Sequence, residues 1–260
     1  MPRAFLILPV IALAAGLLSA QTAPPDAPTV SGPAPHPLRL LVLDAGHGGE
    51  DTGVQVEGGP LEKQLTLDLA RRLQSPLESR LGIRVLLTRM DDRALTADQR
   101  AGAANTARAD AVITVHANSS VRPTASGPEI FIHQPGATAL ALSSADRAAD
   151  QLPVPGGPSR PITFLPWAAV QGEHLTASRA LGEQLALSLG ARLGGAPRHV
   201  RSVPLRMLAG VNAPAVHLEV GYLTNPEEAA RLVTDAFQNQ IVDAVVEALT
   251  RFRGDAEAAQ

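Results

Sequence analysis

Short apolar runs alternate along the chain with longer stretches in which apolar residues recur every three or four positions. A short run between turn-forming residues is typical of a buried strand, whereas the longer period is typical of a helix with one apolar face. The leucines that recur every fourth residue from Leu61 to Leu77 show the second pattern most clearly. We predict strands at 40–45, 82–88, 111–116, 129–133 (near an edge), 203–208 and 214–220, and helices at 61–77, 97–108 and 176–193, with one more starting at 226 and a last one ending before Gly254.

Local residues mark several of these boundaries. Thr96 is a predicted N-cap for the helix at 97–108, and Asn225 followed by Pro226 is a typical helix start. Pro76 lies inside the leucine pattern, so we expect that helix to kink or end near Ser75. The alternation of strands and helices predicts one α/β domain whose mostly parallel sheet is covered by helices on both faces.

Three predicted strands end on or near an ionisable residue: His47, His116 and Glu219. Because the carboxyl ends of parallel strands lie at one edge of a sheet, these side chains can meet there. A fourth candidate, Glu62, follows the glycine-rich loop after the first strand. Two histidines and one carboxylate leave one position of a tetrahedral zinc ion open for water, and a second carboxylate can act as its general base.

Each of these residues also has a purely structural interpretation. A lone histidine at a strand end is often only a hydrogen-bonded loop residue, and Glu62 could simply favour the helix N-terminus. Glu219 is harder to explain in this way, because a carboxylate between Leu218 and Val220 is costly unless it is paired. Asp51 and Glu57 also lie in the first loop, and His47 to Glu50 has the H-x-x-E spacing of another type of zinc hydrolase. From chemistry alone, the carboxylate ligand remains undecided between Glu50 and Glu62.

Composition excludes several kinds of site and partner. The chain contains no cysteine, so a disulfide framework and any thiolate site are excluded, and a metal site must use His, Asp or Glu. The net charge of −3 gives no basic footprint for nucleic acid. We therefore expect no nucleic-acid partner.

The N-terminus has the composition of an export signal. Arg3 is followed by an apolar stretch from Ala4 to Leu18 and then by small residues up to Ala20. We predict a secretory signal peptide at 1–20, a proline-rich linker at 21–37 and a frayed tail at 254–260. The expected location is therefore the periplasm or cell envelope, with membrane attachment only if the signal stays uncleaved.

A set of motifs resembles the zinc-dependent N-acetylmuramoyl-L-alanine amidases, the peptidoglycan amidases that include the bacterial cell-separation enzymes. The resemblance spans about 39 to 252 and the ordered set is highly specific. It runs through Asp44-Ala-Gly-His-Gly-Gly-Glu-Asp-Thr-Gly53, Leu61-Glu62-Lys63, Leu87-Thr88-Arg89, Arg100 with Asn105, Val115-His116-Ala117-Asn118, Gly127-Pro-Glu129 and Pro214-Ala-Val-His-Leu-Glu219-Val-Gly-Tyr-Leu-Thr-Asn225.

The resemblance implies a catalytic domain at 38–253 with an open sheet of about six strands. It also implies that His47, Glu62 and His116 bind Zn²⁺ and that Glu219 is the catalytic carboxylate. The implied reaction is hydrolysis of the amide between N-acetylmuramic acid and L-alanine of peptidoglycan. Two alternatives are a zinc carboxypeptidase or endopeptidase acting on the stem peptide, and a non-catalytic peptidoglycan-binding protein on the same scaffold.

The chain departs from the family pattern in two places. His217 stands where the family usually has an aliphatic residue, and it could orient Glu219 from the same strand face. The segment 134–173 is a variable loop or insertion, and some family members carry a helix near here that blocks the zinc until an activating envelope protein removes it. His133, His174 and His199 have no motif support and are interpreted as surface or loop residues.

Overall fold

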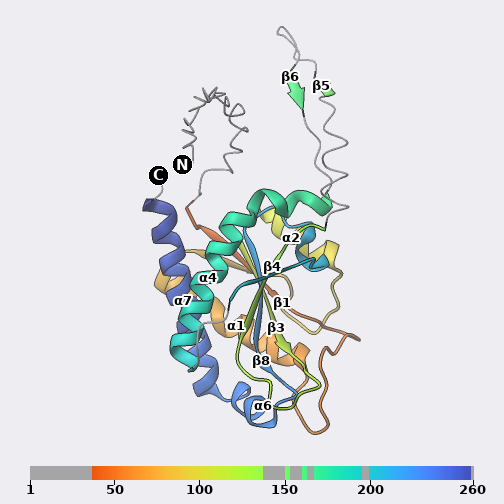
Figure 1. The fold of residues 1–260 in the computed structure, drawn as a ribbon, viewed down its shortest axis with the longest axis vertical. Coiled ribbons are helices and arrows are strands. Elements are labelled where there is room, and N and C mark those ends of the chain that lie inside the picture. The colour runs from red at the N-terminus through yellow and green to blue at the C-terminus, as the bar shows by residue number, and fades with distance from the viewer. Residues whose placement is uncertain (1–36, 137–149, 153–159, 163–166, 195–198, 259–260) are drawn as a thin grey trace, which may run out of the picture. The chain divides into compact units, whose positions relative to one another are not determined.

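A six-stranded sheet forms the centre of the chain, in the order β2-β1-β3-β8-β4-β7 within the part described (Figure 1). The computed structural model describes residues 37–136, 150–152, 160–162, 167–194 and 199–258. Neighbouring strands run parallel except β4 and β8, which are antiparallel. The predicted mostly parallel sheet is therefore confirmed. The strands are β1 (Leu40–Ala45), β2 (Arg84–Leu87), β3 (Ala111–Asn118), β4 (Glu129–His133), β7 (Arg201–Val203) and β8 (Ala215–Tyr222).

Helices cover both faces of this sheet, because alternate residues of each strand point to opposite sides. Leu41 and Leu43 of β1 belong to the apolar cluster that also contains residues of α1, α4 and α7, whereas Val42 between them belongs to a second cluster with residues of α2 and α5. The helices are α1 (Glu62–Leu81), α2 (Ala97–Ala107), α4 (Leu175–Leu193), α5 (Arg206–Ala209), α6 (Pro226–Leu232) and α7 (Asp235–Ala258). Figure 1 shows α4 and α7 side by side.

Two of the predicted helix starts are confirmed. Thr96 and Gln99 form a reciprocal capping box at the start of α2, and the Asn225 side chain accepts from two backbone N–H groups of α6. Of the two outcomes predicted at Pro76, a kink or an end near Ser75, the end is wrong, because α1 continues through Pro76 to Leu81. Leu73 and Leu77 on either side of Pro76 are fully buried, and their packing offsets the lost backbone hydrogen bond.

Two other boundaries differ from the sequence prediction. The strand expected at 203–208 is wrong: β7 ends at Val203, since Pro204 cannot donate to a strand ladder, and α5 follows. The last helix does not end before Gly254 but runs to Ala258. Gln184 of α4 donates to Asp255, and this contact helps hold the final turn of α7.

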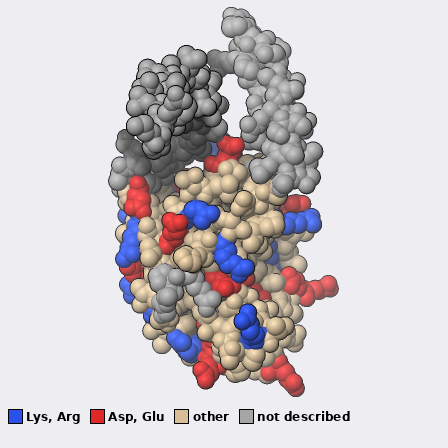
Figure 2. Space-filling view, in the orientation of Figure 1, with Lys and Arg blue, Asp and Glu red and all other residues tan. Residues whose placement is uncertain are grey.

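The variable segment predicted at 134–173 falls largely outside the described residues. Its described parts are an antiparallel pair, β5 (Asp150–Leu152) with β6 (Arg160–Ile162), and a 3₁₀ helix, η1 (Trp167–His174). The predicted signal peptide and most of the linker also lie outside the described residues. Among the helices described, none is long and apolar enough to cross a bilayer. On the face drawn in Figure 2, basic and acidic side chains are interspersed among uncharged ones.

Candidate metal centre

His47 begins the site directly beyond the end of β1. Its backbone has a φ of 60°, in the left-handed region that non-glycine residues rarely adopt. Its Nδ1 lies 2.8 Å from the Asp51 carboxylate, and its Nε2 lies 2.9 Å from Oε1 of Glu62. A carboxylate beside Nδ1 favours hydrogen on Nδ1, which would leave Nε2 as the nitrogen that binds a metal ion.

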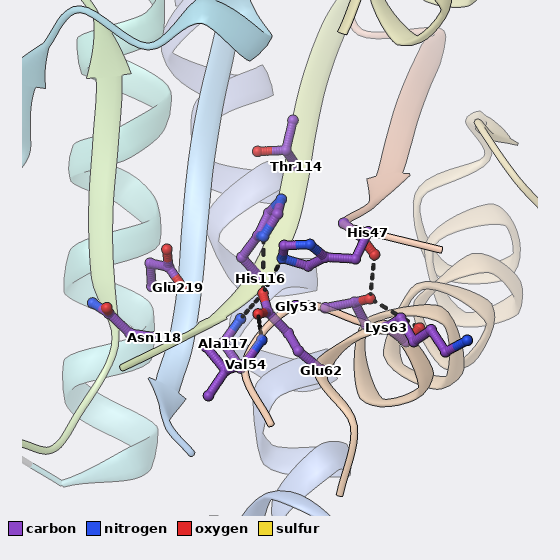
Figure 3. A network of polar contacts seen from close by, with 12 residues as sticks. His47, Gly53, Val54, Glu62, Lys63, Thr114, His116, Ala117, Asn118 and Glu219 are labelled. Carbon is purple, nitrogen blue, oxygen red and sulfur yellow. Dashed lines mark hydrogen bonds and ion pairs between the residues drawn. The ribbon is translucent and has the colours of Figure 1, made fainter. Parts of the chain in front are cut away.

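Glu62 opens helix α1 and is buried, with a relative exposure of 2%. Its Oε1 lies 2.9 Å from Nδ1 of His116 and accepts the backbone N–H of Ala117 at 3.1 Å. Its Oε2 accepts the backbone N–H of Val54 at 2.8 Å. Figure 3 shows His47 from the end of β1 and His116 from β3 converging on this one carboxylate.

Two glycines allow this close approach. A Cβ on Gly46 would lie 2.3 Å from the His116 ring. A Cβ on Gly53, whose φ is +66°, would lie 2.5 Å from the Glu62 carboxylate and 2.6 Å from the His47 ring. Any larger residue at either position would therefore displace one of the three converging side chains.

Burial and mutual contacts shift the pKa values of this cluster in different directions. Burial lowers the pKa of His116, so that its imidazole is neutral near pH 7, as a metal ligand requires. Burial opposes ionisation of Glu62, but the two histidines outweigh it and hold the pKa of that carboxyl well below its usual range. Burial also acts to lower the pKa of His47, yet contacts with Glu62 and Asp51 raise it overall.

These three residues fit a divalent metal ion. One atom from each of His47, Glu62 and His116 lies within 4.8 Å of the other two. Two imidazole nitrogens lie at equal distances of 2.9 Å from a single carboxylate oxygen, which places three possible ligand atoms close together. A mixed set of two nitrogens and one oxygen suits zinc in an open, catalytic geometry better than magnesium or calcium.

Glu219 lies on β8 directly opposite His116 of β3. Its Oε1 contacts Nε2 of His217 at 2.8 Å, while its Oε2 is buried and has no hydrogen-bond partner within the described part of the chain. A buried carboxylate oxygen without a partner is costly unless a ligand or water completes it. Figure 3 shows Glu219 on the strand beside His116.

Comparison with known proteins decides the family. Residues 41–251 match the family described as N-acetylmuramoyl-L-alanine amidase. The chain belongs to this amidase family. It is 28% identical over 240 residues to the N-acetylmuramoyl-L-alanine amidase AmiC of Neisseria meningitidis, covering 88% of this chain and 58% of AmiC. It is also 28% identical to AmiA of Escherichia coli K12, covering 82% of this chain and 76% of AmiA.

A solved structure supports the same assignment. The catalytic domain of CwlV, an N-acetylmuramoyl-L-alanine amidase from Bacillus (Paenibacillus) polymyxa var. colistinus, superposes with a TM-score of 0.63 at 26% identity. The match covers 82% of this chain and 97% of that domain. By contrast, the chain spans only 58% and 57% of the two AmiC proteins that it matches, from N. meningitidis and from E. coli O6:H1.

In this amidase-family chain the structure brings together the residues that the sequence singled out, with two exceptions. Glu50 and Glu57 are exposed in the first loop and take no part in the cluster. The interpretation of His133 as a surface or loop residue is wrong, because it is the last residue of β4 and is only 5% exposed. His199 is exposed, and His174 is half-buried at the end of η1.

Sequence reasoning gave no role to two buried arginines behind the site. Arg89 is fully buried and joins the end of β1 to the first turn of α1. Arg100 donates to Asp44 at 2.6 Å and to the backbone carbonyl of His47 at 2.8 Å. A charged residue directly after a predicted strand was the available signal. The acceptors of Arg89 are the carbonyls of Ala45, Gly46, Lys63 and Asp91 and the hydroxyl of Thr66.

Replacing Arg89 with methionine is expected to destabilise the fold by ~3 kcal/mol or more. The substitution keeps much of the apolar stem but removes five hydrogen bonds from a buried cation, and a hydrogen bond to a charged group contributes about 1.5–3 kcal/mol. Other side chains can still donate to three of the carbonyls, so the loss stays well below the sum of the five bonds. Urea unfolding followed by circular dichroism measures the change. The control is Arg84→Met on the exposed side of β2, expected to stay within ~0.5 kcal/mol. Equal stability of the two variants would contradict this role of Arg89.

Proposed function

We propose that this chain is a zinc-dependent N-acetylmuramoyl-L-alanine amidase. It hydrolyses the amide between the lactyl group of N-acetylmuramic acid and L-alanine of the stem peptide. The observation that carries the proposal is the juxtaposition of a two-histidine, one-carboxylate cluster with the unpartnered Oε2 of Glu219 on the adjacent strand. Family membership and the names of the matched relatives support the choice of substrate.

His47, Glu62 and His116 would hold the zinc ion. A zinc ion held there would supply Lewis-acid chemistry, because it lowers the pKa of a water molecule and polarises a carbonyl oxygen. Asp51 keeps the His47 ring in the orientation that the cluster needs. Arg89 and Arg100 hold the backbone that carries His47.

Glu219 would move the proton. Its Oε2 takes a proton from the attacking water and then delivers it to the departing amide nitrogen, which leaves as the amine of L-alanine. The new C–O bond forms at the lactyl carbonyl as the C–N bond breaks. The Glu219 side chain is only 14% exposed, and this low-dielectric surrounding strengthens its electrostatic influence.

The proposed location is the cell envelope. A signal peptide at 1–20 would direct export of the chain and then be cleaved. The linker at 21–37 would lie between the cleavage site and the catalytic domain. Peptidoglycan, the substrate class named for the family, lies outside the cytoplasmic membrane.

Product analysis tests the proposed function. Purified sacculi are incubated with the protein, with and without a zinc chelator, and the soluble products are identified by mass spectrometry. We expect intact stem peptides that begin with L-alanine, and we expect the chelator to abolish their release.

Other products would identify the alternatives. Peptides cut inside the stem would indicate a carboxypeptidase or endopeptidase and contradict the amidase assignment. Binding to sacculi without soluble products would indicate a non-catalytic protein. Full activity in the chelator, with no zinc found in the protein, would contradict the metal assignment alone.

A further inference from the structure

His217 and Glu219 are neighbours on the same face of strand β8. On β8 the two residues are two positions apart, so their side chains are on the same face of the sheet. Across the sheet His116 pairs with Glu219, and Thr114 pairs with His217. On the other side Phe131 of β4 pairs with His217. His217 is thus enclosed by Thr114 on β3 and Phe131 on β4.

Both ring nitrogens of His217 are used. Nδ1 lies 2.9 Å from Oγ1 of Thr114, and Nε2 lies 2.8 Å from Oε1 of Glu219. The ring is buried, with centroid distances of 4.6 Å to His116 and 5.9 Å to Phe131. A ring held at both nitrogens and packed on two sides has a single orientation.

The hydrogen positions follow from the partners. An ionised carboxylate only accepts hydrogen bonds, so Nε2 of His217 carries the hydrogen that faces Glu219. With that hydrogen on Nε2, Nδ1 is the acceptor and the Thr114 hydroxyl is the donor. Thr114, His217 and Glu219 therefore form a directed chain of two hydrogen bonds that ends on one oxygen of Glu219.

We propose that His217 is a positioning residue that holds Oε1 of Glu219 and thereby keeps Oε2 available for proton transfer. Glutamate has three rotatable side-chain bonds, and a carboxylate that must be placed in each turnover reacts more slowly than one already in place. The inference rests on the proposed function for the role of Glu219. The inference adds that Thr114 on β3 holds His217, and that His217 in turn holds the carboxylate of Glu219.

The kinetic test is a double-mutant cycle between His217 and Thr114. We expect His217→Leu to lower kcat on sacculi about tenfold with KM unchanged within about twofold, since substrate binding is untouched. Thr114→Val should lower kcat about threefold in the wild-type background and have no effect in the His217→Leu background. His217→Gln, whose amide can still donate to Glu219, should recover most of kcat.

Three measurements separate positioning from a merely structural role. Bound zinc per chain and the urea midpoint are determined for every variant. The control is His133→Leu, which removes another buried histidine from β4 and is expected to leave kcat within about twofold. Additive losses from Thr114→Val and His217→Leu, loss of zinc in His217→Leu, or an unchanged kcat in that variant would each overturn the proposal. If His217→Leu does not fold, the His217→Gln and Thr114→Val results decide.

A spectroscopic readout is independent of activity. In zinc-loaded protein, ¹⁵N–¹H correlation spectra should show His217 as the neutral tautomer with hydrogen on Nε2. Its Nε2 resonance should move in Glu219→Gln, where the acceptor changes. The opposite tautomer, or an Nε2 resonance at the same position in wild type and Glu219→Gln, would overturn the proposal. This holds even if wild-type protein released no stem peptide. A wild type that is inactive but shows the expected tautomer would count against the proposed function and for the positioning contact.

Discussion

Replacing Glu219 with glutamine is expected to abolish turnover while leaving zinc binding intact. The amide has the shape of the carboxylate, and its oxygen can still accept from Nε2 of His217, so the surroundings need not move. An amide, however, cannot take up the proton from water. General acid–base catalysis contributes about 10²–10⁴-fold to rates, so we expect kcat to fall about 10³-fold.

The measurement pairs metal content with product release from sacculi. Glu227→Gln is the control, because Glu227 is an exposed acid in the first turn of α6 and should keep kcat within about twofold. If both variants bind as much zinc as wild type, the loss of kcat in Glu219→Gln comes from the chemical step and not from metal binding. Full activity of Glu219→Gln would show that another group moves the proton, and the proposed mechanism would then be wrong.

Replacing Glu62 with glutamine is expected to remove zinc and activity together. Among the residues that the structure describes, Glu62 is the one carboxylate whose oxygen lies 2.9 Å from a nitrogen of both His47 and His116. Losing a hydrogen-bond partner of a ligand typically weakens metal affinity by about 10–100-fold, so losing a ligand should cost more than about 100-fold. Competition titration with a zinc-binding dye measures the affinity, and product release gives the activity.

The matched control is Glu50→Gln in the same loop. Glu50 is exposed and stands at the H-x-x-E spacing from His47 that suggested it as a ligand. We expect this variant to bind zinc with wild-type affinity. If Glu50→Gln loses zinc and Glu62→Gln keeps it, the metal site uses the spacing along the chain rather than the cluster that the fold assembles.

The elements of the fold were largely predictable because they depend on local patterns. The leucine period predicted α1, the apolar runs predicted the central strands, and the capping residues predicted the starts of α2 and α6. Two of the errors occurred where distant packing outweighed a local signal. Pro76 lies in a helix because buried leucines flank it, and Gly254 lies in a helix whose last turn contacts α4.

The site was only partly predictable for the same reason. That His47, His116 and Glu219 share one edge follows from strand ends in a parallel sheet, which the pattern alone indicates. The choice between Glu50 and Glu62 does not follow from spacing, and it came from the resemblance to the amidases. Asp51 beside His47, and Thr114 beside His217, depend on how a loop folds back and how two strands register.

The sequence by itself determined that strands would end in ionisable side chains at one edge of an α/β sheet, because periodicity and strand direction are local properties. The tertiary structure alone decided which oxygens meet which nitrogens. Glu62 reaches both histidines because Gly46 and Gly53 leave room for the rings and Arg89 joins β1 to α1. These contacts join residues far apart in the chain, and no local pattern encodes their distances.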